Sequence, residues 1–266
     1  MQPSNFITLL TDFGLKDGNV GVMKGVIWGL APQVKIADLS HQISPQNVPE
    51  AALILVRSAP YFPRGAIHVV VVDPGVGTSR RPIAARIGSH YYVCPDNGIL
   101  TMMFARAEAE SWPVHIVHAD KPDYWLPEVS HVFHGRDIFA PLAAHLANGV
   151  PLQDLGTPMD DPLRLKLPLP ERTEHGWLGE VIHIDHFGNV SSNIRQEHLG
   201  DPANLQVHLC GFTIDGLVRA FGERPPGELV ALYGSTGNLI VSVVNGSAAQ
   251  RLGARPGDPL EVKVSS

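Results

Sequence analysis

The sequence has few of the features that mark membrane, disulfide-stabilised or nucleic-acid-binding proteins. No stretch approaches the roughly 18 consecutive apolar residues of a membrane-spanning helix. The two cysteines, Cys94 and Cys210, form neither a CxxC pair nor a disulfide framework, which fits a reducing cytoplasm. The first ten residues lack both a basic region and a long apolar run, so we expect no signal peptide. We therefore expect a cytoplasmic protein without membrane partners.

Basic blocks and the common catalytic or metal-binding motifs are also missing. Twenty Lys and Arg residues against 26 Asp and Glu residues give a net charge of −6, which argues against nucleic-acid binding. The 13 histidines are scattered, and no HExxH, HxH or DxDxDG spacing occurs, so we expect no metal and no other cofactor. The sequence has no GxSxG, Walker loop or GxGxxG. A serine nucleophile and a nucleotide held by its phosphates are therefore not indicated.

What is abundant is apolar sequence interrupted by turns. Of the 266 residues, 44% are hydrophobic and 17% charged, enough for a substantial core in one large domain or two ordinary ones. The 26 glycines and 23 prolines favour many turns and a site built from loops.

The first part of the chain, residues 1–150, alternates apolar strands with helical periodicity. This alternation predicts an α/β domain with a layered, mostly parallel sheet and flanking helices. Strands are expected at 6–10, 34–39, 66–72, 83–87, 91–94 and 114–117, and helices at 18–30, 48–56, 99–107 and 133–146.

The pattern changes after residue 150. Residues 151–174 are rich in proline and are expected to form an interdomain linker. Residues 175–266 contain short apolar runs separated by turn residues, with few helical stretches, which predicts a smaller antiparallel β-barrel or sandwich domain. Its strands are expected at 177–184, 205–209, 228–233, 239–244 and 259–264.

The stretch VVVVDPGVGTSRR, residues 69–81, places polar side chains where a buried strand ends. Asp73 follows the strand, Pro74 and Gly75 turn the chain, and Arg80 comes a few residues later. Asp12 stands in the same position after the first strand. Ligands of open α/β sheets bind outside the carboxyl ends of the strands, so these residues are candidates for polar chemistry. The alternative is that both aspartates only cap turns or helices, with a surface arginine beside Asp73.

Further polar clusters also border apolar runs. FHGRDIFAP opens a helix whose free backbone N–H groups can orient a polar ligand or water. DHFGN stands at a turn between two expected strands, and a weaker cluster combines GSTG with a following Asn-Gly pair. These clusters occupy residues 133–141, 185–189, 234–237 and 245–246.

Taken together, the motifs TDFG-x-x-D, VVDPGVGT-x-RR, PDNG, FHGRDIFAP and DHFGNV resemble, in this order, those of the S-adenosyl-L-methionine (SAM) hydroxide adenosyltransferases. These SAM hydrolases are relatives of the fluorinase and chlorinase. The resemblance runs from residue 7 to about residue 250. It implies an N-terminal α/β domain, a smaller C-terminal β domain, and a homotrimer in which each active site lies between the N-terminal domain of one subunit and the C-terminal domain of its neighbour.

The implied reaction is attack of water or hydroxide on the 5′ carbon of SAM, which yields adenosine and L-methionine. Asp73, Arg80 and His134 match the Asp-Arg-His triad of the family. His134 or Asp73 can accept the proton of the attacking water, and the sequence leaves open which one does. In the fluorinase the position of Asp73 is a tyrosine, and Gly135 matches a serine that contacts the halide.

The resemblance also implies contacts to each part of the substrate. Asp12 corresponds to a carboxylate that accepts hydrogen bonds from both ribose hydroxyls, with Asp17 and Asn19 assisting at the amino-acid end. Asp185 corresponds to the contact with the methionine ammonium group. Phe187 would pack on the adenine face.

Three polar residues complete the implied substrate site. Asn189 would bond the base edge or the ribose, Ser235 the methionine carboxylate, and Asn245 with its neighbours the adenine. The stretch NLIVSVVNG lacks a glutamate usual in the family, which leaves the adenine contacts of this strand open. Two other functions stay open: a SAM-dependent halogenase of chlorinase type, and a non-catalytic sensor of adenosine or SAM.

Overall fold

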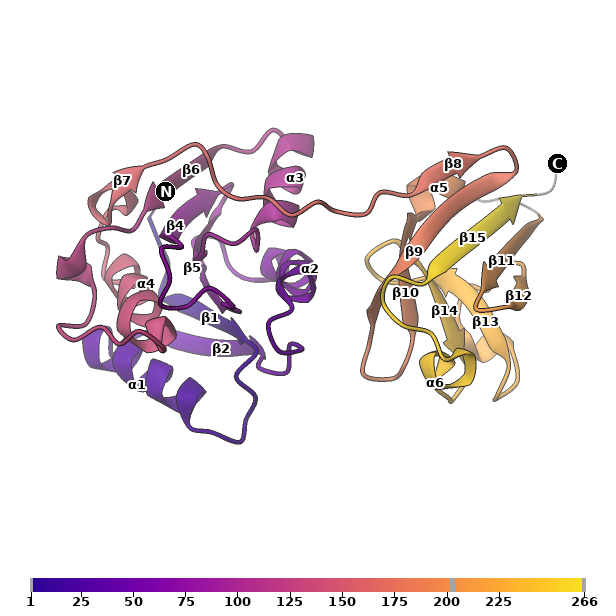
Figure 1. Ribbon diagram of the computed structural model, residues 1–266, viewed down its shortest axis with the longest axis horizontal. Coiled ribbons are helices and arrows are strands. Elements are labelled where there is room, and N and C mark those ends of the chain that lie inside the picture. Colours follow the sequence, from indigo (N-terminus) through magenta and orange to yellow (C-terminus); the bar gives the residue numbers. More distant parts are fainter. Residues whose placement is uncertain (1, 201–203, 265–266) are drawn as a thin grey trace. The chain divides into compact units, whose positions relative to one another are not determined.

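The computed structural model describes residues 2–200 and 204–264 and divides the chain into two compact units, Met1–Leu165 and Lys166–Ser266 (Figure 1). The division lies within the proline-rich segment 151–174. None of the described helices is long and apolar enough to cross a membrane.

The first unit is built on a seven-stranded mixed sheet with the order β2-β1-β3-β5-β4-β6-β7. The strands β2, β1, β3 and β5 run parallel, whereas β4, β6 and β7 join by antiparallel pairing. The sheet thus confirms the layered α/β domain. The strands are β1 (Phe6–Thr11), β2 (Lys35–Ser40), β3 (Ile67–Val71), β4 (Pro82–Ile87), β5 (His90–Pro95), β6 (Val114–His118) and β7 (Thr157–Pro158).

Helices cover both faces of this sheet (Figure 1). One core packs Met23 and Ile27 of α1 and Leu142 of α4 against β1 and β3, and the other packs α2 and α3 against the opposite face. Burial of these apolar stripes is what holds the helices in place. The helices are α1 (Asn19–Leu30), α2 (Val48–Ser58), α3 (Thr101–Ala109) and α4 (Ala140–Ala147), with short turns η1 (Ala59–Tyr61), η2 (Pro122–Tyr124), η3 (Gly135–Phe139) and η4 (Leu152–Asp154).

The first half of the proline-rich segment belongs to the first unit. Its strand β7 pairs with β6, and its backbone is tied down by Leu163 N–H donating to Asp96 at 2.8 Å and Leu165 N–H donating to Thr101 at 2.8 Å. Gly98 has room for no side chain there, because an added Cβ would lie 2.7 Å from Leu165. Residues 151–165 are therefore packed against the first unit.

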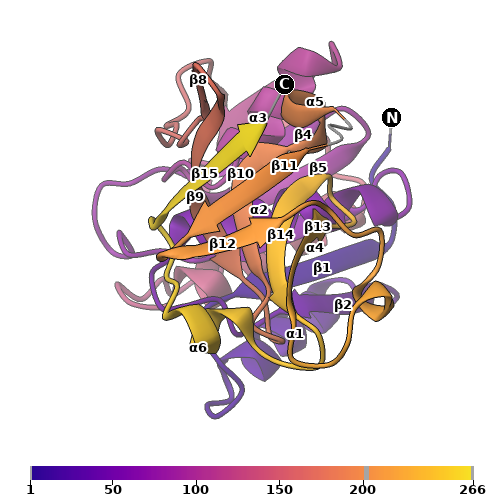
Figure 2. The same ribbon diagram turned by 90° about the vertical axis from the view of Figure 1, so that its right-hand side faces the viewer.

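The second unit is an antiparallel sheet with the order β12-β11-β15-β9-β10-β14-β13, in which β8 also pairs with β9. The two end strands β12 and β13 contact each other, so the sheet curls almost into a barrel, as predicted. Figure 2 shows β11, β12 and β15 running side by side. The strands are β8 (Glu171–Thr173), β9 (Gly176–Ile184), β10 (Val190–Arg195), β11 (Leu205–Leu209), β12 (Phe212–Asp215), β13 (Leu229–Tyr233), β14 (Asn238–Val243) and β15 (Pro259–Val264). The short helices are α5 (Gln196–Leu199), α6 (Ala248–Leu252) and η5 (Phe221–Glu223).

Candidate active site

The turn after β3 returns the chain so that an arginine faces the aspartate that begins the turn. Val76 N–H donates to the Asp73 carbonyl, and Thr78 N–H donates to the Gly75 carbonyl. Gly77 has a φ of +76°, a left-handed conformation that glycine adopts without strain. Arg80 therefore lies directly against Asp73.

Asp73, Arg80 and His134 form one hydrogen-bonded cluster. The Arg80 Nε donates to both carboxylate oxygens of Asp73, at 3.0 and 2.8 Å, and Nη2 bonds Asp73 as well. The same Nη2 lies 2.6 Å from His134 Nδ1. The side chains of Asp73 and Arg80 are only 5% and 8% exposed, so bulk water screens the ion pair little. The structure brings together the three residues that the sequence singled out as a triad.

The contact with Arg80 fixes the state of the histidine. A guanidinium N–H can only donate, so His134 Nδ1 accepts and the neutral ring carries its proton on Nε2. Burial lowers the pKa of His134 below its ordinary value of 6.5, and the positive charge of Arg80 lowers it further, against the opposing effect of Asp73 and Asp137. The ring is thus held neutral near pH 7.

A buried aspartate holds the loop that carries His134. Asp137 is fully buried and accepts hydrogen bonds from both the N–H and the hydroxyl of Ser130, each at 2.8 Å. The Ser130 hydroxyl in turn accepts from Phe133 N–H, and the Ser130 backbone bonds His134. Arg136 also pairs with Asp137. The expected first turn of the helix is the π-helical turn η3, a form often found at functional sites.

Gly135 begins η3 in a crowded position. An added Cβ would lie 3.2 Å from Met23 Sδ and 3.3 Å from ring carbons of both Phe13 and Phe133. Such contacts are tight, so a serine at this position would require its neighbours to move.

Asp12 lies at the same edge of the sheet as Asp73, because β1 and β3 are parallel neighbours with Thr11 opposite Val71. Its Oδ2 accepts the N–H of Gln46 at 2.8 Å, and Gln46 adopts a φ of +64°. Asp17 and Asn19 are exposed at and before the start of α1. Gln46 is a neighbour of the site that the sequence analysis did not identify, since its only local signal is the helix cap at Asn47.

The β9–β10 turn of the second unit is organised by Asp185. Its Oδ1 accepts the N–H groups of Phe187 and Asn189, at 3.0 and 2.8 Å, and its Oδ2 accepts Asn189 Nδ2 at 2.7 Å. Phe187 is left 74% exposed. An aromatic face and two polar side chains are thus presented at one turn of the surface.

Asn245 lies near this turn, whereas Ser235 does not. Gly188 accepts a hydrogen bond from Ala249 N–H, so the β9–β10 turn contacts the segment that leads from Asn245 into α6. Ser235 precedes β14, and the other end of that strand leads to Asn245. The β10–β14 register pairs Arg195 with Asn238, so Ser235, three residues before Asn238, lies toward the end of β10 that is far from the turn.

Among the described residues, no group of three or more His, Cys, Asp or Glu side chains is arranged to hold a metal ion. The expectation of a reaction without metal or other cofactor stays a prediction.

Two family models match the chain. The SAM hydroxide adenosyltransferase N-terminal domain matches residues 7–156, and the SAM hydroxide adenosyltransferase C-terminal domain matches residues 179–261. The two matches fall on either side of the division between the compact units.

Curated proteins and a solved structure resemble the chain over nearly its whole length. The (R)-S-adenosyl-L-methionine hydrolases of Salinispora tropica and Thermus thermophilus are each 41% identical to it, over 98% of the chain and 99% and 100% of those proteins. A fluorinase of Nocardia brasiliensis is 28% identical over 97% of the chain and 96% of its own length. The crystal structure of an uncharacterized conserved protein from Thermotoga maritima matches with a TM-score of 0.89 and 37% identity, covering 97% of this chain and 99% of that one.

Proposed function

The chain belongs to the SAM hydroxide adenosyltransferase family, and from this premise we propose that it hydrolyses S-adenosyl-L-methionine to adenosine and L-methionine. The observation that carries the proposal is the cluster of Asp73, Arg80 and His134 at the carboxyl edge of β3. A carboxylate, a guanidinium and a neutral imidazole in hydrogen-bond contact suit the binding and activation of one water molecule.

The reaction places few demands on the protein beyond positioning. The water oxygen forms a bond to C5′ as the bond from C5′ to sulfur breaks, and the electron pair of that bond stays on sulfur. The sulfonium leaves as a neutral thioether, so no general acid is needed, and one proton of the water is released. The site must hold water in line behind C5′ and stabilise the hydroxide character that develops on it.

The geometry favours Asp73 as the group that accepts the proton. The Nδ1 lone pair of His134 is already engaged by Arg80, and Asp73 Oδ2 accepts two hydrogen bonds from Arg80, whereas Asp73 Oδ1 accepts one from Arg80 Nε and keeps a second lone pair. In this assignment Arg80 stabilises the developing hydroxide, and His134 fixes the plane of the guanidinium.

We assign the remaining residues to parts of the substrate. Asp12, with its Oδ2 oriented by Gln46, binds the ribose hydroxyls, and Asp17 and Asn19 assist at the amino-acid end. In the second unit Asp185 binds the methionine ammonium, Phe187 stacks on adenine, and Asn189 bonds the base edge or ribose. Ser235 is assigned to the methionine carboxylate and Asn245 to the adenine.

We further propose a cytoplasmic homotrimer in which each site combines the first unit of one subunit with the second unit of its neighbour. Cys94 is buried and Cys210 exposed, and both are free thiols, which supports a reducing compartment. Analytical ultracentrifugation tests the trimer, because a monomeric enzyme with full activity would exclude the shared site.

The function is tested by incubating the protein with SAM and separating the products by chromatography. Adenosine and methionine are expected in equal amounts, and Asp73→Asn, which keeps the shape but loses the charge, is expected to form far less of both. Added chloride distinguishes a halogenase, which would form 5′-chloro-5′-deoxyadenosine. Saturable binding of SAM by calorimetry with no product at high enzyme concentration would instead indicate a sensor and overturn the proposal.

A further inference from the structure

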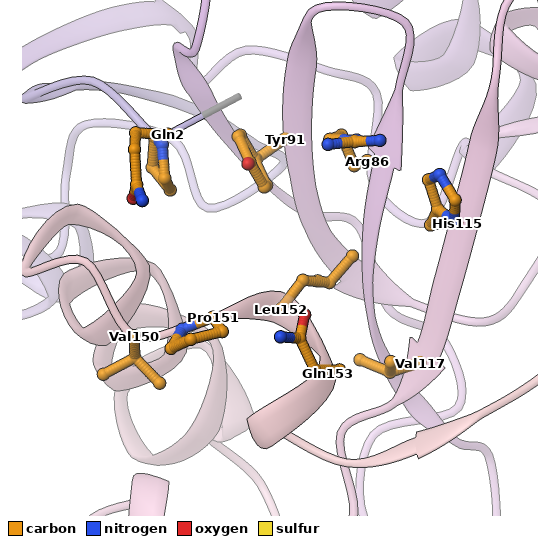
Figure 3. A pocket seen from close by; sticks show the side chains of 10 residues that line it. Gln2, Arg86, Tyr91, His115, Val117, Val150, Pro151, Leu152 and Gln153 are labelled. Atoms are coloured by element: carbon orange, nitrogen blue, oxygen red, sulfur yellow. The ribbon is translucent and has the colours of Figure 1, made fainter.

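The first unit contains a cavity of about 390 Å³ at the edge of its sheet opposite the triad (Figure 3). Strand register brings Arg86 of β4 beside Tyr91 of β5 on one side and His115 of β6 on the other. Tyr91 stands at the beginning of β5, whereas Asp73 follows the end of the parallel neighbour β3. The cavity and the triad are therefore separate places in one domain.

The charged chemistry of the described lining is cationic. The Nε of Arg86 is buried and has no hydrogen-bond partner among the described residues. Of the described residues that line the cavity none is acidic, while Gln2, His115 and Gln153 bring further polar groups to its rim. A buried N–H of a positively charged group without an acceptor is costly, so this lining is suited to a negatively charged ligand.

The rest of the cavity is apolar. Val117, Val150 and Leu152 line it together with Pro151, and Figure 3 shows Leu152 extending toward the space below Arg86. The volume falls in the range of small-molecule sites, which typically combine an apolar surface with a few polar anchors. A lone inorganic ion would leave most of this apolar surface without contact.

We propose that the cavity binds a small organic acid, with its carboxylate or phosphate group on Arg86 and its apolar body against Val117, Val150 and Leu152. A guanidinium binds either oxyanion through two parallel hydrogen bonds. Zwitterionic amino acids fit less well, because the part of the lining that the structure describes holds no carboxylate to pair with their ammonium group. The proposal does not depend on the hydrolysis of SAM.

Isothermal titration calorimetry with benzoate and phenyl phosphate tests the site, with benzamide as the neutral probe of matching shape. We expect at least one of the two acids to bind and benzamide not to. Arg86→Gln is expected to weaken that binding about 10- to 100-fold, the effect of one charge-assisted hydrogen bond. Turnover of SAM should be unchanged, and Arg224→Gln, at an exposed arginine, should bind as the wild type does.

Leu152→Trp is a second variant that fills the cavity and leaves Arg86 in place, and it should also abolish binding. It keeps the test valid if Arg86→Gln does not fold. Binding that survives both variants, or equal affinity for benzamide, would overturn the proposal. So would the failure of both acids to bind. If neither acid binds while Arg86→Gln changes the sedimentation of the protein, the partner of Arg86 is a carboxylate of a second copy of the chain. That result would refute the small-molecule site.

Discussion

At the scale of single residues, the guanidinium of Arg80 links the members of the triad. It is the one side chain that contacts both other members of the triad, and its carbon Cζ also lies 5.2 Å from the centre of the Phe139 ring. The fork of N–H groups lets one residue hold a carboxylate and an imidazole in a single plane, which an ammonium group cannot do.

Replacing Arg80 by lysine should therefore remove the bridge while keeping the charge. We expect kcat for SAM hydrolysis to fall about 100- to 1,000-fold, the usual effect of losing one preorganised donor, with a much smaller change in KM. Arg81→Lys is the matched control, because Arg81 pairs with Asp96 and Asp161 and not with the triad. Equal activity of the two variants would show that the bridge is not needed.

The neutral state of His134 predicts an acid limb in the pH profile of kcat/KM. Burial and the charge of Arg80 lower the pKa of His134 below 6.5, so activity should be constant above that pH and fall below it as the ring gains a proton and repels Arg80. His134→Asn offers an oxygen acceptor to Arg80 but does not titrate, and its profile should lack this limb. A limb centred above pH 6.5 in the wild type would contradict the assignment.

At the scale of elements, the site depends on two loops that meet at one glycine. The turn after β3 carries Asp73 and Arg80, and the loop before η3 carries His134. An added Cβ on Gly77 would lie 2.1 Å from the carbonyl oxygen of His131, so the backbones of the two loops are in direct contact at this glycine. This contact holds the loop that carries Arg80 at a fixed distance from the loop that carries His134.

Gly77→Ala is accordingly expected to reduce both stability and activity. The left-handed φ alone costs alanine on the order of 1 kcal/mol, and the clash with His131 adds to it. Gly149→Ala separates the two effects, because Gly149 has a φ of +89° but open space around it. Urea unfolding and kcat should both show a larger loss for Gly77→Ala, and equal losses would argue against the loop contact.

The elements of the first unit were largely predictable, because buried strands and helix stripes carry strong periodicity. Asp12 and Asp73 could be placed at one sheet edge for the same reason. The position of His134 beside Arg80 could not be derived, since it depends on Asp137 and Ser130, which fix an irregular loop through tertiary hydrogen bonds. It came from the family resemblance alone.

Strand β10 shows why part of the second unit escaped prediction. Its residues Ser191, Ser192 and Asn193 are polar yet buried. The Ser192 hydroxyl donates to the Leu239 carbonyl at 3.0 Å, and Asn193 donates to the Pro168 carbonyl at 3.1 Å and accepts Glu180 N–H at 2.9 Å. Partners far away in the sequence make this polar strand stable, and no local pattern reveals them.

At the scale of the whole molecule, each unit has its own core, and each carries one set of candidate residues. The triad and Asp12 belong to the first unit, and the loop of Asp185 belongs to the second. The change of pattern after residue 150 predicted two domains. A site shared between subunits leaves no local signal in one chain, so its composition rests on the resemblance and stays a proposal.

Stability should depend on pH through His68, which is fully buried between Thr8 and His90. Burial, with a smaller effect of His90, lowers its pKa to about 3 in the folded state, against 6.5 in the unfolded chain. Between about pH 3 and pH 6.5 the unfolded state therefore binds a proton at His68 that the folded state does not bind. We expect the free energy of unfolding to be unaffected by this group above pH 6.5 and to fall by at most about 1.4 kcal/mol per pH unit below it.

Urea titrations at a series of pH values check this effect. His68→Gln cannot titrate, so its unfolding free energy should decrease less steeply below pH 6.5 than that of the wild type, even if the variant is less stable at pH 7. Parallel slopes for the two proteins would show that His68 does not control the acid stability.

The most direct measurement of the central claim follows the oxygen atom of the water. The protein is incubated with SAM in water labelled with oxygen-18, and the products are analysed by mass spectrometry. If Asp73, Arg80 and His134 direct water at C5′, each adenosine formed carries the label in its 5′ hydroxyl and methionine carries none. Adenosine without the label, or no adenosine at all, would contradict the account.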